Sequence, residues 1–174
     1  MRYFTLEELC RSETALRMGL PNTPPPPICE RLRTLTETLL DPLREAWAAR
    51  CATEAWGDPA ILVTSGYRSA ALNRAVGGAA ASAHTLGWAA DLRPKNGHLL
   101  DFKECCRSFF AARPFDQLIS ESEDAAGTPA WMHIGLYDRL DRQRRELLTM
   151  RNGRYLPMTD GALRAISVPS GVTK

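Results

Sequence analysis

The sequence predicts an α+β fold: a single domain with a central antiparallel sheet flanked by helices. Apolar residues recur at helical spacing mainly in the earlier part of the chain, whereas short apolar segments typical of antiparallel strands concentrate later. The length of 174 residues is enough for one compact domain with a core, and too short for two of comfortable size. We therefore predict one domain over residues 1–158, followed by an irregular tail over 159–174.

The charge balance argues against a nucleic-acid partner. The chain has 22 lysines and arginines against 20 aspartates and glutamates, a formal net charge of +2. The arginines near the C-terminus are interleaved with acidic residues, as on an ordinary solvated face. We expect no nucleic-acid partner and a monomer.

No segment reads as a membrane span or an export signal. No apolar run has the length that crosses a bilayer, and charged residues interrupt the first residues of the chain. The five cysteines lack C-x-x-C spacing, so we expect them to be reduced. These features predict a cytoplasmic protein as synthesised.

The sequence predicts four helices, with one extended segment between the first and the second. Thr5 and Glu8 form a capping box that starts a first helix. The run NTPPPP, residues 22–27, reads as an extended polyproline crossing that belongs to the domain. A long helix is expected from Ile28 to about Arg50, kinked at Pro42. A second long helix is expected over residues 97–113, and a short one over LNRAV.

The strands are predicted from short apolar segments bounded by turn residues. AILVTSGYR reads as a buried strand that leaves through Ser65 and Gly66. Asn152 and Gly153 predict a type I′ turn between the last two strands. The other expected strands are AADL, FDQLIS and WMHIGL.

The chain has only three histidines, and two of them stand in a distinctive pattern. His84 precedes Asp91 by seven residues, in Ser82-x-His84-x-x-Gly87-x-Ala89-x-Asp91. That spacing is too long for neighbours on one helix face, but suits a turn that leads into a strand, so both side chains can converge on a metal ion. His133 is the candidate third ligand, although a lone strand histidine is more often structural. His98 is expected to be exposed and without a role.

The joint pattern, with Trp131-x-His133 further along, resembles that of the zinc D-Ala-D-Ala carboxypeptidases and cell-wall endopeptidases. The resemblance extends to YFTLEELCRSETALRMGLPNTPPP, LLDPLRE, VTSGYRSAALNRAVGGA, FDQLISE and GRYLPM. It implies the Hedgehog/DD-peptidase fold, with Zn²⁺ held by His84, Asp91 and His133. Two imidazoles and one carboxylate leave an open coordination position, which is typical of catalytic zinc. Such an ion activates water and polarises a scissile carbonyl.

Further residues are assigned from the same resemblance. Arg68 matches an arginine that points at the substrate near the metal, although a structural salt bridge is the alternative. Ser82 is expected to contact the substrate or to hydrogen-bond to a ligand. Tyr67 and Trp131 are expected to line the substrate cleft, together with Trp88 unless that residue is packed in the core.

The general base is where the chain departs from many relatives. They carry a glutamate three residues before the last histidine, whereas this chain has Ala130. Glu121 is the best substitute, with Glu123 and Asp124 as fallbacks, and a solvated loop carboxylate is the alternative interpretation.

Two functional hypotheses follow. The first is a zinc metallopeptidase that cuts peptidoglycan or its stem peptides, as a carboxypeptidase or an endopeptidase. Such an enzyme would act after phage-type release or on imported wall fragments. The second is a catalytically inactive, zinc-stabilised binding module of the same fold. A carboxylate near the open zinc position distinguishes the two.

Overall fold

The computed structural model describes residues 1–159, and it has the predicted α+β architecture. The predicted tail lies, apart from Thr159, outside the described residues. The helices are α1 (Leu6–Cys10), α2 (Glu13–Met18), α3 (Pro26–Leu35), α4 (Asp41–Glu54), α5 (Ala70–Ala75) and α6 (Leu99–Phe110). The strands are β1 (Ile61–Ser65), β2 (Ala89–Pro94), β3 (Gln117–Glu121), β4 (Trp131–Gly135), β5 (Glu146–Arg151) and β6 (Arg154–Pro157).

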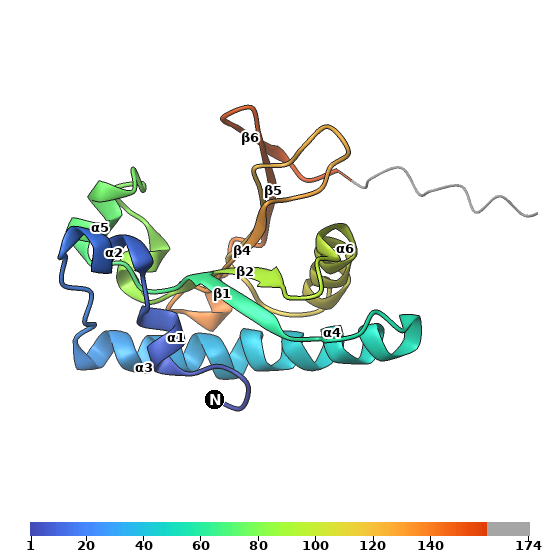
Figure 1. Ribbon diagram of the computed structural model, residues 1–174, viewed down its shortest axis with the longest axis horizontal. Helices are drawn as coiled ribbons and strands as arrows, with labels where there is room; N and C mark the ends of the chain where they lie inside the picture. Colours follow the sequence, from blue (N-terminus) through green and yellow to red (C-terminus); the bar gives the residue numbers. More distant parts are fainter. Residues whose placement is uncertain (160–174) are drawn as a thin grey trace, which may run out of the picture.

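The long predicted helix forms as α3 and α4, joined by a π-helical segment, Thr36–Leu40, and Figure 1 shows them as one run. It begins at Pro26, so the expectation of an extended run to residue 27 is wrong at its end. A proline fits the first turn of a helix because its missing N–H needs no partner there. Pro42 also lies in the first turn of α4, directly after the π-helical segment. The proline therefore does not divide the long helix into two separate helices.

The six strands form one mixed sheet in the order β1-β2-β4-β3-β5-β6. The predicted all-antiparallel sheet is wrong at one pair, because β5 runs parallel to β3. β4 pairs with β3 on one side, and the chain then crosses to the other side of β3 before β5 begins. The type I′ turn is confirmed, with positive φ at Asn152 (51°) and Gly153 (73°). β1 is an edge strand whose burial alternates, not the fully buried strand expected.

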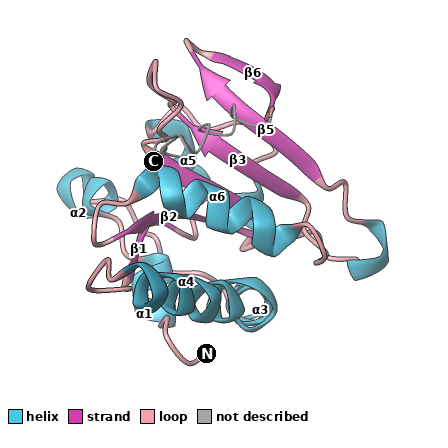
Figure 2. Cartoon of the chain, turned by 90° about the vertical axis from the view of Figure 1, so that its right-hand side faces the viewer, coloured by secondary structure: helices cyan, strands magenta, loops and turns pink. Residues whose placement is uncertain are grey.

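One face of the sheet carries the hydrophobic core. Because side chains alternate along a strand, the residues that share this face repeat every second position. Leu92 of β2 pairs with Met132 of β4, while Ile134 pairs with Leu118 of β3, and all four side chains are fully buried. The helix α6 packs on β2, β3 and α4, and it crosses the sheet in Figure 2. The opposite face is therefore available for polar side chains.

The connection between β3 and β4 is held by a buried charge cluster. Glu123 accepts hydrogen bonds from Lys103 of α6, from Thr149 of β5 and from Arg151. Lys103 also donates to the carbonyl of Gly127. Burial alone would raise the pKa of Glu123, but the bonds from Lys103 and Arg151 lower it below the ordinary glutamate value. Glu123 therefore anchors a loop.

No helix among residues 1–159 has the length and apolar character needed to cross a membrane.

Replacing Glu123 by glutamine should lower the free energy of unfolding by about 3 kcal/mol at neutral pH, because buried Lys103 loses its partner. Since the folded pKa of Glu123 is depressed, this contribution is present above the ordinary glutamate pKa and is lost as pH falls below about 4. Urea unfolding at pH 7 and pH 3 measures both effects. Glu30→Gln, at an exposed surface pair, is the control. An equal loss at both pH values would contradict the assignment.

Candidate metal centre

Two of the three candidate ligands lie side by side on adjacent strands. Asp91 of β2 pairs directly with His133 of β4 in the antiparallel register. Both therefore point to the face of the sheet opposite the core. Their neighbours Ala90 and Ile134, which pair with each other, are buried on the core side. The carboxylate and the imidazole are both buried, with their residues 5% and 8% exposed.

The third candidate, His84, comes from a single 3₁₀ turn, Ala83–Leu86, that precedes β2. Gly87 ends this turn with a φ of +74° and directs the chain into the strand, as the sequence predicts. A side chain at position 87 would also meet Ile28 of α3, whose Cγ2 lies 2.8 Å from the position of a built Cβ. The glycine therefore serves both the turn and the close packing against α3.

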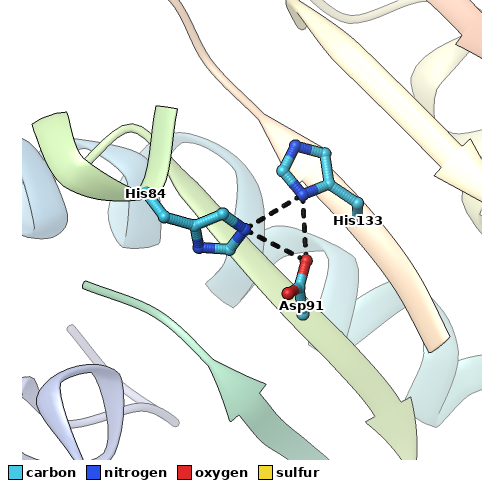
Figure 3. A group of neighbouring side chains, drawn as sticks. All are labelled: His84, Asp91 and His133. Carbon is cyan, nitrogen blue, oxygen red and sulfur yellow. Dashed lines mark hydrogen bonds and ion pairs between the residues drawn. The ribbon is translucent and has the colours of Figure 1, made fainter. Parts of the chain in front are cut away.

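The three side chains converge on one point, as Figure 3 shows. His133 Nδ1 lies 2.9 Å from Asp91 Oδ1 and 3.2 Å from His84 Nε2. His84 Nε2 is 3.2 Å from the same carboxylate oxygen. One ligand atom from each residue thus faces a shared, buried position, and these residues can hold a metal ion.

Neighbouring groups orient two of these ligands. His84 Nδ1 lies 2.7 Å from the carbonyl oxygen of Gly66, which can only accept a hydrogen bond, so Nδ1 carries the proton and Nε2 presents its lone pair. Arg68 donates to Asp91 Oδ2 at 2.7 Å and to the hydroxyl of Ser65 at 2.8 Å. Asp91 Oδ1 is thereby left to the cluster.

The electrostatics of His84 and Asp91 favour the forms of these two groups that bind metals. Burial lowers the pKa of His84, which keeps the imidazole neutral. Burial alone would raise the pKa of Asp91, but the groups around it lower that pKa well below the ordinary range, and Arg68 donates to its other oxygen, so the carboxylate is ionised. Neutral imidazoles and a carboxylate are the protonation states that metal binding requires. The donor set therefore fits a divalent metal.

The cluster lies in a cavity of about 740 Å³. Arg68, Ser82 and Trp131, all assigned from the sequence, line it. Tyr67 is not among the lining residues: it belongs to the hydrophobic core and its residue is 9% exposed. Trp88 is also buried in the core, with the guanidinium of Arg31 over its ring.

Of the three carboxylates considered as a base, only Glu121 lines this cavity. It ends β3 opposite Trp131 and is 8% exposed, so it is not a solvated loop residue. Burial raises the pKa of Glu121, an effect that nearby His133 partly offsets. Glu123 instead binds Lys103 in the buried charge cluster described above. Asp124 accepts hydrogen bonds from the backbone N–H groups of Ala126 and Thr128.

Other parts of the cavity were not identified from the sequence. One wall is the loop of residues 77–82, shaped by buried Asn73, whose amide donates to the carbonyl of Ala79. Another is the β5–β6 hairpin, which contributes Met150 and Tyr155. The only sequence signals for these walls were Gly77-Gly78 and the motif GRYLPM. Neither of them indicates a catalytic or ligand-binding role by itself.

Replacing Gly66 by alanine should weaken metal binding about 10- to 100-fold, as loss of a ligand's orienting partner commonly does. A Cβ there would lie 2.1 Å from the carbonyl oxygen of Leu9, so the carbonyl that orients His84 must shift. Competition titration of zinc against a chromophoric chelator measures the affinity. Gly57→Ala is the control, because Gly57 has a positive φ but no atom near a built Cβ. Equal zinc affinity in wild type and Gly66→Ala would contradict the orienting role.

Comparison with known proteins bears directly on this centre. A protein-family model described as Peptidase M15 matches residues 2–126, which include His84, Asp91 and Glu121. His133 follows the matched segment but pairs with two strands inside it. No curated protein matches the chain. Because the family model covers more than half of the sequence, the chain belongs to the Peptidase M15 family.

Proposed function

We propose that this protein is a zinc-dependent peptidase that hydrolyses peptide bonds in bacterial peptidoglycan or its stem peptides. The observation that carries the proposal is the convergence of His84, Asp91 and His133 within a cavity large enough for a peptide segment, in a chain of this family. The α+β arrangement is consistent with the Hedgehog/DD-peptidase fold, which we include in the proposal.

The residues divide the chemistry among them. His84, Asp91 and His133 would hold zinc, which when bound supplies a Lewis acid for the scissile carbonyl and lowers the pKa of water. Glu121 would take the proton from water as it adds to the carbonyl, and would return it to the leaving amine. Arg68 is fixed by Ser65 and Asp91, so its guanidinium can bind a substrate carboxylate or the developing oxyanion.

Glu121 also favours an enzyme over the non-catalytic binding module. A binding module needs the metal ligands but no buried carboxylate beside them. Glu121 is buried in the cavity that contains the cluster, and its pKa is raised toward the range useful for proton transfer. We further propose that the enzyme meets its substrate after phage-type release or as imported wall fragments.

Replacing Glu121 by glutamine should lower kcat by about 10²- to 10⁴-fold, the usual contribution of a positioned general base, while zinc content stays stoichiometric. Asp91→Ala should lose both zinc and activity. Amino groups released from peptidoglycan and from synthetic stem peptides ending in D-Ala-D-Ala measure the activity, and also separate endopeptidase from carboxypeptidase action.

Glu30→Gln is the matched control, because Glu30 lies on the exposed side of α3. Stoichiometric zinc without hydrolysis of any of these substrates by the wild type would favour the binding module. Hydrolysis that survives in Glu121→Gln would remove Glu121 from the mechanism.

A further inference from the structure

Tyr155, on the β5–β6 hairpin, has a side-chain hydrogen bond to the candidate base. Its hydroxyl donates to Glu121 Oε1, with 3.3 Å between the oxygens. This is longer than a typical O–H···O bond, so the contact is loose. Tyr155 is 59% exposed, whereas Glu121 is 8% exposed, so the hydroxyl reaches inward from an open strand to a buried carboxylate.

The fold delivers this tyrosine to the cavity. Tyr155 pairs with Met150 across the hairpin, and both residues line the cavity. β5 in turn pairs with β3, which ends at Glu121. The turn at Asn152 and Gly153 sets which residues of β6 face the cavity, because hairpin register follows from the turn type. The hydroxyl is therefore placed by backbone geometry.

We propose that Tyr155 is a positioning residue: its hydroxyl holds one oxygen of the Glu121 carboxylate, so that the other is presented to the substrate and water. The proposal deepens the proposed function, on which it rests for its catalytic meaning. Burial and the neighbouring Glu121 raise the pKa of Tyr155 above its ordinary value, so the phenol keeps its proton and can only donate to the carboxylate. A hydrogen bond to the ionised form also stabilises that form.

The test removes this hydroxyl alone. In Tyr155→Phe the pKa of Glu121, followed by NMR of its side-chain carboxyl carbon, should rise in zinc-free and zinc-loaded protein. The other groups that act on Glu121 are His133, Asp91 and Arg68, and they are unchanged in the variant. The same variant should lose about tenfold in kcat, the size expected for one hydrogen bond to a charged group, with KM within about twofold of wild type. The acid limb of the kcat profile should move to higher pH with the Glu121 pKa.

Tyr3→Phe is the control, because the ring of Tyr3 contacts the guanidinium groups of Arg2 and Arg44 and is not part of the cavity lining. An unchanged Glu121 pKa in Tyr155→Phe would overturn the positioning role, whether or not the protein hydrolyses a substrate. A raised pKa with unchanged kcat and acid limb would also overturn it, because the contact would then be without catalytic effect. If the wild type has no peptidase activity, the proposed function fails, and the titration still decides whether Tyr155 controls Glu121.

Discussion

The backbone pairing of β2 with β4 is the constraint on which the rest of the site depends. In this register Asp91 lies opposite His133, and the residues on either side of them fill the core. A slip by one residue would turn the metal ligands toward the helices and the apolar side chains toward the cavity, at a large cost in buried apolar surface. The hydrophobic core therefore sets the geometry of the polar centre, and the pairing of β3 with β4 extends the same constraint to Glu121.

The third ligand depends on a different support, the packing of the N-terminal segment against the loop after β1. The carbonyl of Leu9 accepts a hydrogen bond from the backbone N–H of Tyr67, at 2.6 Å, and leaves no room for a side chain at Gly66. The side chain of Asn22 donates to the carbonyl of Tyr67 and accepts from the N–H of Ser69. The N-terminal segment, through Leu9 of α1 and the loop residue Asn22, thus holds the carbonyl that orients the His84 ring.

Local patterns in the sequence were sufficient for most elements, because capping and apolar periodicity depend on neighbouring residues. The motif spacing also pointed to the three side chains that converge in the structure. The parallel β3–β5 pair was not predictable in this way, since it depends on where a crossing segment lies in space. The role of Gly66 acts through a backbone carbonyl, which any residue possesses. Aromatic side chains suit both a cleft and a core, so the sequence alone does not tell that Tyr67 belongs to the core cluster.

The departure at position 130 has a spatial explanation within the same sheet. The backbone N–H of Ala130 donates to the carbonyl of Glu121 at 2.8 Å, so the two positions are neighbours at the end of the β3–β4 pair. A carboxylate on β3 can therefore serve the same corner of the cavity as one placed just before β4. Glu121, with the hydroxyl of Tyr155 beside it, is the carboxylate that β3 presents at this corner.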